Sequence, residues 1–255
     1  MTLDLNELLD DWAATPGEVS ARTIIGRDGI ELIQLRVDLG VMQMFPDGRP
    51  DGARYRGFDA ALTFIEHEVR LMGPAPGPPD WQELERELFQ TNYRRLALTA
   101  VAEDSLKRQD PGGARSALVR AVRDCDTCLR ALELLDEHRG GGPWTLRPTL
   151  VFNRGRLTVQ LLVLEDHVED AVDEAENGAA AMERLLGELG ADEDERRRDP
   201  GVTFLRDLAR NLRRDYGIGK TLHEQLEEAI ENEDFESAAR LRDKLRQRDG
   251  ESEDE

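Results

Sequence analysis

The sequence predicts a mostly helical α+β protein: an N-terminal β-hairpin with helices, tetratricopeptide-like helix pairs, and a C-terminal helical hairpin. Three observations support this class. The 255 residues are 39% apolar, 35% charged and only 5% aromatic, which is typical of helix-rich proteins. Apolar residues recur at helical spacing over most of the chain beyond residue 58. Two runs typical of β-strands lie within residues 22–39, on either side of a turn.

Composition and chain breaks divide the sequence into parts. The predicted regions are an α+β region (1–72), a helix-pair region (80–190), a helix plus hairpin (200–247, hairpin 221–247) and an acidic tail (248–255). The proline-rich stretch Gly73–Pro79 does not fit regular structure and separates the first two regions. Ala191–Asp199 is expected to be a linker, and the tail is expected to be unordered.

The N-terminal region combines a short helix, near Leu3–Trp12, with two β-type runs. The runs Arg22–Gly26 and Glu31–Leu39 flank an Asp28-Gly29 pair, which is a strong hairpin signal. We therefore expect a two-stranded hairpin with Gly29 in a left-handed conformation, packed on neighbouring helices because a lone hairpin is only marginally stable. An amphipathic helix is expected from about Asp59 to Leu71.

The middle of the chain reads as two consecutive helix pairs. Asp80 is the expected N-cap of a long helix that ends near Asp110–Gly113, and a second helix follows from about Ala114 to His138. Residues 149–189 carry both an alternating strand pattern and a helical stripe; we choose two helices, broken near residues 165–167. Consecutive helix pairs of this kind look tetratricopeptide-like.

The C-terminal stretch 221–247 predicts two short helices folded back on each other. Thr221 with Glu224 three residues later has the pattern of a capping box. Asn232-Glu233-Asp234 interrupts the helical pattern with turn residues, and Asp234 is the expected N-cap of the second helix.

One pattern inside this stretch is specific. Its residues are Ala229-Ile230, Asp234-Phe235-Glu236, Ala238-Ala239, Leu241-Arg242-Asp243 and Leu245. The pattern resembles the UVR motif, named for the excision-repair proteins UvrB and UvrC. The resemblance implies a helical hairpin without catalytic activity that docks on other proteins, often on another UVR hairpin. The order of motifs along the whole chain also resembles a set of bacterial, especially planctomycete, UvrB/UvrC motif-containing proteins.

The resemblance implies a protein-binding surface made of apolar anchors and two orienting charges: Leu222, Leu226, Ile230, Phe235, Ala239, Leu241, Leu245, Arg242 and Asp243. The larger anchors are expected to point inward or towards a partner. The partners it suggests are excision-repair proteins or regulators of Clp-type proteases. The leading hypothesis is therefore a non-enzymatic adaptor, and self-association through paired hairpins is an alternative.

A net charge of −20 opposes broad nucleic-acid binding, because phosphate contacts come from Lys and Arg. No stretch approaches the roughly 20 apolar residues of a membrane span. The acidic, amphipathic start of the chain does not look like a secretory signal. We expect a cytoplasmic protein whose partner is another protein.

Catalytic and metal chemistry have little support. Phosphate-binding, zinc-protease, serine-hydrolase and dinucleotide motifs are not found, so an enzyme would need an unrecognised carboxylate site. Cys125 and Cys128 form a single Cys-x-x-Cys inside a helical pattern, without the further ligands that a zinc site needs. We expect two half-buried helix residues there, and neither metal nor cofactor.

The loop Gly48–Gly52 is a second, weaker site prediction. Its proline and glycines need no function, because they are ordinary turn residues. As a site, the loop would present Arg49 as a clamp for an anion or carboxylate, beside Asp51.

Overall fold

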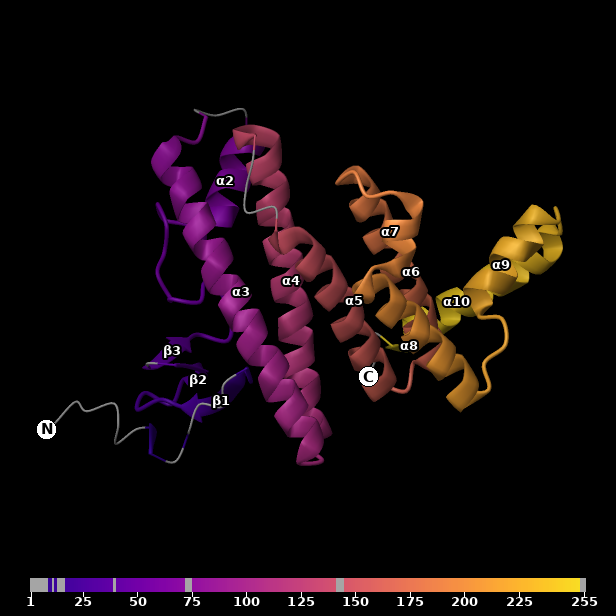
Figure 1. Cartoon of the computed structure of the whole chain (residues 1–255), viewed down its shortest axis with the longest axis horizontal. Coiled ribbons are helices and arrows are strands. Elements are labelled where there is room, and N and C mark those ends of the chain that lie inside the picture. Colours follow the sequence, from indigo (N-terminus) through magenta and orange to yellow (C-terminus); the bar gives the residue numbers. More distant parts are fainter. Residues whose placement is uncertain are drawn as a thin grey trace, which may run out of the picture. The chain divides into compact units, whose positions relative to one another are not determined.

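The computed structural model describes residues 9–10, 12, 17–38, 40–71, 75–140 and 145–252, with side chains through Arg246. These residues contain nine helices and one small sheet (Figure 1). The chain forms two compact units, divided after Leu157. The mostly helical α+β class is confirmed. The helix predicted near Leu3–Trp12 lies largely outside the described residues.

The sheet of the first unit has three antiparallel strands in the order β1-β2-β3: Ser20–Ile25, Glu31–Val37 and Gly40–Met44. The predicted hairpin is β1 and β2, and Gly29 adopts the left-handed conformation expected of it (φ 79°). The prediction of only two strands was wrong, because a third strand, β3, pairs with β2, with Val37 opposite Gly40. β3 was missed because its Gly-Val-Met-Gln-Met sequence has little of the β-branched or aromatic character typical of strands.

Three helices complete most of this unit: α2 (Ala61–Arg70), α3 (Pro78–Lys107) and α4 (Pro111–Arg139). Gly77, not Asp80, is the N-cap of α3; Asp80 lies at the third helical position, where it accepts a hydrogen bond from Gly77 N at 2.7 Å. Asp110 caps α4 by accepting from Gly113 N at 2.9 Å, so α4 begins before the predicted Ala114. In both helices proline occupies the first turn, where a missing N–H costs nothing.

The core of the first unit lies where α2, α3, α4 and the first turns of α5 (Leu146–Leu164) meet. α3 and α4 run side by side along most of their length (Figure 1). The buried side chains of this core are Leu62, Phe64, Ile65, Trp81, Leu84, Leu88, Cys128, Ala131, Leu132, Leu135 and Leu150. The two cysteines are fully buried, with 0% exposure, rather than half-buried as predicted.

The second unit contains the end of α5, α6 (Val168–Glu188), α7 (Glu193–Arg198), α8 (Pro200–Tyr216), α9 (Leu222–Glu231) and α10 (Phe235–Ser252). The choice of helix for residues 149–189 is confirmed, with the break at Glu165–His167. α6 packs against α8, and their small and branched side chains form a second core. The tetratricopeptide-like character of the helix pairs stays a prediction.

Two expectations about irregular segments were wrong. The predicted linker Ala191–Asp199 contains α7, whose capping box joins Asp192 and Glu195 at its N-terminus. The predicted unordered tail begins too early, because α10 continues to Ser252.

Candidate functional site

The helices α9 and α10 form an antiparallel hairpin, as the sequence predicts. Its turn is closed by a hydrogen bond of 2.8 Å from Asp234 N to the Ala229 carbonyl, with Glu233 in a left-handed conformation (φ 56°). Asp234 then accepts from Ser237 N at 3.1 Å, which confirms it as the N-cap of α10. Hydrogen bonds from the Ser237 side chain and from Ser237 N lower the pKa of the Asp234 carboxyl.

The start of α9 has the predicted capping box. Thr221 Oγ1 accepts from Glu224 N at 3.2 Å, and Glu224 Oε2 accepts from Thr221 N at 2.7 Å. Thr221 is completely buried, which is uncommon for a threonine at a helix end. We call residues 220–224 the hairpin base.

The interior of the hairpin is lined mainly by small side chains. Ala229, Ala238 and Leu245 are buried, with exposures of 9, 8 and 6%. Four predicted anchors are only half-buried: Leu222, Leu226, Ala239 and Leu241. Small residues let two helices approach closely, but they remove little apolar surface from water.

The large apolar side chains of the turn region point outward. Phe235 is 69% exposed and Ile230 is 52% exposed. We call residues 230–235 the hairpin tip. The sequence predicted that these side chains point either inward or towards a partner. In the single chain they do not point inward. The predicted orienting charges, Arg242 and Asp243, are also exposed and pair with each other at 2.8 Å.

The hairpin base is held by polar contacts to other helices of the same unit. Asp173 of α6 accepts a hydrogen bond from Thr221 Oγ1 at 2.7 Å, and its second oxygen lies 2.9 Å from His223 Nδ1. Arg213 of α8 pairs with Glu224 at 2.7 Å and with Glu176 of α6 at 2.9 Å. These contacts fix one end of the hairpin and leave the tip in solvent.

The pKa of Glu224 reflects this contact. Burial raises the pKa of the carboxyl, but hydrogen bonds from Arg213 and from Thr221 N outweigh burial, so the pKa of Glu224 is lowered overall. Reasoning from sequence missed Asp173, Glu176 and Arg213 as parts of the site. No local pattern marks them, because Asp173 and Thr221 are far apart in the chain.

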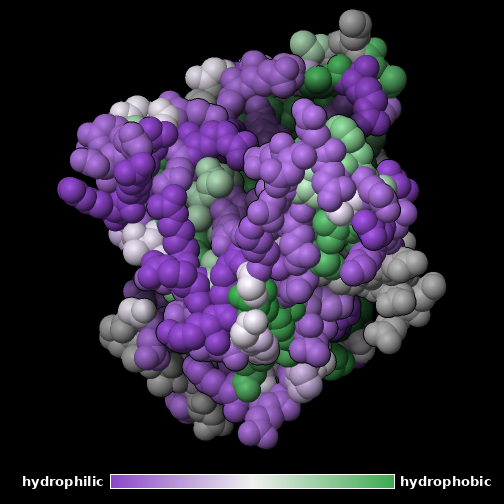
Figure 2. Space-filling view, turned by 90° about the vertical axis from the view of Figure 1, so that its right-hand side faces the viewer, coloured by the Kyte–Doolittle hydropathy of each residue, from purple (hydrophilic) through white to green (hydrophobic). Residues whose placement is uncertain are grey.

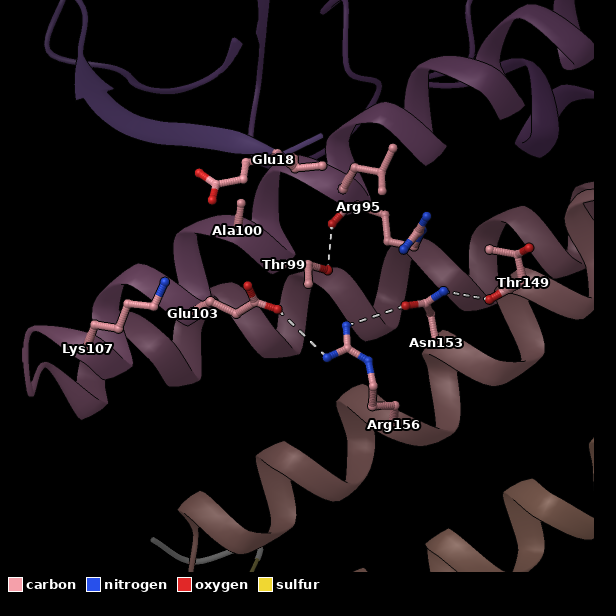
Figure 3. A pocket seen from close by; sticks show the side chains of 11 residues that line it. Glu18, Arg95, Thr99, Ala100, Glu103, Lys107, Thr149, Asn153 and Arg156 are labelled. Carbon is pink, nitrogen blue, oxygen red and sulfur yellow. Dashed lines mark hydrogen bonds and ion pairs between the residues drawn. The ribbon is translucent and has the colours of Figure 1, made fainter. Parts of the chain in front are cut away.

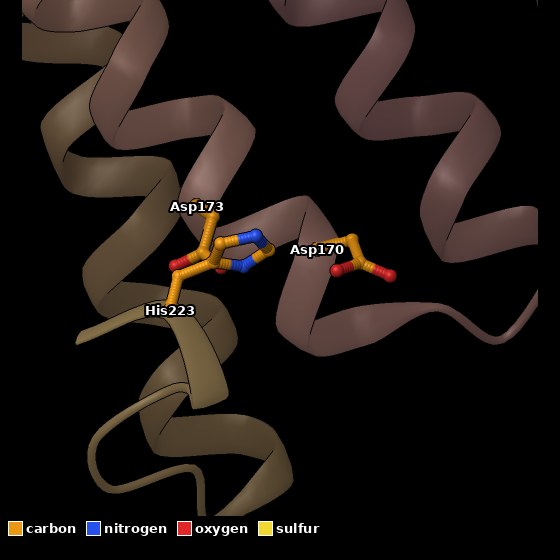
Figure 4. Close-up of side chains that lie close together, drawn as sticks. All are labelled: Asp170, Asp173 and His223. Carbon is orange, nitrogen blue, oxygen red and sulfur yellow. The ribbon is translucent and has the colours of Figure 1, made fainter. Parts of the chain in front are cut away.

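Figure 4 shows the one group of ionisable side chains, within the described part of the chain, with metal-ligand spacing. Asp170, Asp173 and His223 bring one ligand atom each to within 4.8 Å of the others. Asp173 accepts a hydrogen bond from Thr221 and contacts His223, so two of the three residues already belong to the attachment of the hairpin base. A zinc ion takes four ligands, and three protein side chains are the smallest set that holds one.

The loop Gly48–Gly52 lies on α3, and the Arg49 side chain is 1% exposed. Its Nη2 hydrogen-bonds to Asp51 Oδ2 at 3.1 Å and to Glu83, and its Nε lies 3.7 Å from Glu87. Burial raises the pKa of Asp51, but hydrogen bonds from Ala53 N and Gln90 and the charge of Arg49 lower it overall. The guanidinium is thus occupied by carboxylates of its own chain; the binding of an external anion by Arg49 stays a prediction.

The cysteine pair lies in the α3–α4 interface. Cys128 Sγ is 3.7 Å from the Leu88 carbonyl oxygen. Burial raises the pKa of the Cys125 thiol to about 12 and raises that of Cys128 as well. Neither group is a reactive thiolate at neutral pH.

In a comparison with known families, residues 220–247 match the UvrB/uvrC motif, UVR. The chain therefore carries a UVR motif at the position predicted from its sequence. UVR motifs are known for protein interaction and are linked to excision repair. No curated protein and no solved structure matches this chain.

Two surface properties bear on partners. No helix among the described residues combines the length and the apolar character needed to cross a membrane. The face of the molecule in Figure 2 is mainly hydrophilic, with apolar side chains in small separate patches. Phe235, at 69%, has the highest exposed fraction among the large apolar side chains that the structure describes, and Ile25 and Leu71 follow with 68 and 63%.

Proposed function

We propose that the protein is a non-enzymatic adaptor that binds another protein through its UVR hairpin, with Phe235 and Ile230 as the principal apolar contacts. The observation that carries this proposal is their outward orientation on a hairpin whose base is fixed. Aromatic side chains that become buried at the centre of an interface usually dominate its binding energy. A fixed base also limits the conformational entropy lost on binding.

The partner class follows from the motif. By the resemblance to bacterial UVR-containing proteins, the partner is a protein linked to excision repair or to Clp-type proteolysis, and itself a candidate to carry a UVR hairpin. Two buried, unbridged cysteines agree with a reducing compartment such as the cytoplasm. That the protein acts without catalysis is part of the same proposal. It is supported by the unreactive cysteines and by the absence of catalytic motifs from the sequence.

The test is an affinity capture of partners from the native organism with the wild type and Phe235→Ala. Because Phe235 is exposed, the variant should keep the folded structure and the unfolding temperature while losing at least about tenfold in affinity for the captured partner, a loss typical of an aromatic anchor. The matched control is Phe89→Ala on α3, where the phenylalanine is 43% exposed. Unchanged capture by Phe235→Ala would contradict the proposal.

Self-association is the second candidate, because the exposed tip residues also suit a head-to-head contact between two hairpins. A sizing measurement distinguishes the two. A dimer that becomes monomeric with Phe235→Ala, but not with Phe89→Ala, indicates self-association. A monomer that captures a different protein indicates the adaptor.

A further inference from the structure

Three arginines are buried among the described residues of the first unit: Arg49, Arg94 and Arg95, with exposures of 4, 3 and 3%. A buried charge is very costly unless an opposite charge or a set of hydrogen bonds compensates it. Arg49 has three carboxylates around it. Arg94 forms a two-point pair with Asp124, with distances of 2.7 and 2.8 Å, and also donates to the carbonyl oxygens of Phe45 and Gly48.

Arg95 is different. Its Nε and Nη2 both donate to a single neutral atom, Asn92 Oδ1, at 3.1 and 3.0 Å. Throughout the described part of the chain, no carboxylate oxygen lies within ion-pair distance of Arg95, and its Nη1 makes no hydrogen bond. The nearby thiols are neutral, because burial raises the pKa of Cys125 to about 12. The charge of Asp124 acts on the pKa of Arg95 from farther away and raises it, but no described carboxylate forms an ion pair with this guanidinium.

This side chain lines a cavity of about 510 Å³ between α3 and α5. Figure 3 shows Arg95, Thr99 and Glu103 of α3 facing Asn153 and Arg156 of α5. Arg156 is a second cation in this cavity. It makes only long contacts, 3.5 Å to Asn153 and 3.8 Å to Glu103.

The charge of Arg156 acts on Arg95. Burial lowers the pKa of Arg95, and the positive charge of Arg156 lowers it further. With Lys107, the cavity wall holds three cations against the two carboxylates of Glu18 and Glu103. A locally positive cavity is unusual in a chain whose net charge is −20. Such a wall attracts anions and repels cations.

We propose that this cavity binds a small ligand through a phosphate or carboxylate group, with Arg95 as the buried charge partner and Arg156 as the second clamp. A guanidinium has a planar set of donors that matches two oxygens of such a group, and Nη1 of Arg95 is unused. The ligand would supply the missing negative charge. This site is independent of the UVR hairpin.

Binding is tested by calorimetry on the full chain with inorganic phosphate and with succinate as probes, at constant ionic strength adjusted with chloride. The variants are Arg95→Met and Arg156→Gln. The matched control is Arg108→Gln, the arginine that follows the last residue of α3, whose side chain is 75% exposed and pairs with Asp104. We expect saturable binding of at least one probe to the wild type and to Arg108→Gln, weakened at least about tenfold in both cavity variants.

The probe that binds identifies the group: phosphate alone indicates a phosphate ester, and succinate alone indicates a carboxylate. The absence of saturable binding by both probes would overturn the proposal. So would wild-type affinity in Arg156→Gln, which decides the matter if Arg95→Met does not fold.

A second readout separates a ligand site from a structural arginine. Without ligand, Arg95→Met should unfold at a temperature no lower than the wild type, because it removes an unbalanced buried charge. Arg94→Met should unfold at a lower temperature, because it leaves Asp124 without its partner. The bound probe should raise the unfolding temperature of the wild type and not that of Arg95→Met. Equal losses in Arg95→Met and Arg94→Met would contradict an unbalanced Arg95.

Discussion

The pairs α3/α4 and α9/α10 have the same architecture but bury different side chains. The α3/α4 pair encloses large ones, including Leu84, Leu88 and Leu132, each with an exposure of 0–1%. The α9/α10 pair encloses two alanines and a leucine, and it leaves Ile230 and Phe235 outside. The first pair therefore obtains its stability from its own interior, while the second keeps its large apolar side chains available to another molecule.

The two pairs also differ in how charges are used. In α3/α4 the ion pair of Arg94 with Asp124 is almost completely buried. In the hairpin, the pair of Arg242 with Asp243 is more than half exposed on both sides. Buried pairs are sensitive to the loss of one partner, whereas exposed pairs are screened by water and salt.

The largest expected effect follows from this contrast. Asp124→Asn leaves Arg94 buried without its negative partner, so the free energy of unfolding should fall by about 3–5 kcal/mol. The matched variant Asp243→Asn should change it by less than about 0.5 kcal/mol. Urea denaturation measures both values. Similar losses in the two variants would refute the distinction between the pairs.

The next effect concerns apolar packing. Leu88→Ala removes a side chain that is 1% exposed in the α3/α4 core, and the free energy of unfolding should fall by about 2–5 kcal/mol. Ile230→Ala removes a side chain of similar size from the hairpin tip and should change it by less than about 0.5 kcal/mol. A loss above about 1 kcal/mol for Ile230→Ala would show that the tip packs inward in solution.

The smallest effect is a pH dependence at the hairpin base. Because the pKa of Glu224 is lower in the folded chain than its usual value of 4.5, its contribution to stability is complete above about pH 4.5. That contribution is lost as the pH falls through the folded pKa. Glu224 is partly exposed, so the contribution should be less than about 1 kcal/mol.

The measurement compares wild type with Glu224→Gln by urea denaturation at a series of pH values. The difference in unfolding free energy should be present at neutral pH and shrink in acid. Glu227→Gln, an exposed position of the same helix, should show no such change. A difference that does not vary with pH would mean that the Arg213–Glu224 contact does not stabilise the base.

Local patterns were sufficient for most of the secondary structure and for the UVR motif. The capping box of Thr221 and Glu224, the N-cap at Asp234 and the left-handed Gly29 were predicted correctly. Each depends on side chains and backbone groups within a few residues of one another. The third strand was missed because its stability comes from pairing with β2 and from the burial of Met44, not from strand-forming residues of its own.

Contacts between residues that are far apart in the sequence became known only from the tertiary structure. Asp173 and Arg213 hold the hairpin base across separate helices, and neither belongs to a recognisable motif. The adjacent arginines Arg94 and Arg95 look alike in the sequence, yet one faces Asp124 and the other faces a cavity. Burial and charge balance depend on the complete fold, whereas helix ends and turns depend on neighbouring residues. For that reason the motif could be identified from the sequence, but the surroundings of its side chains could not be predicted from it.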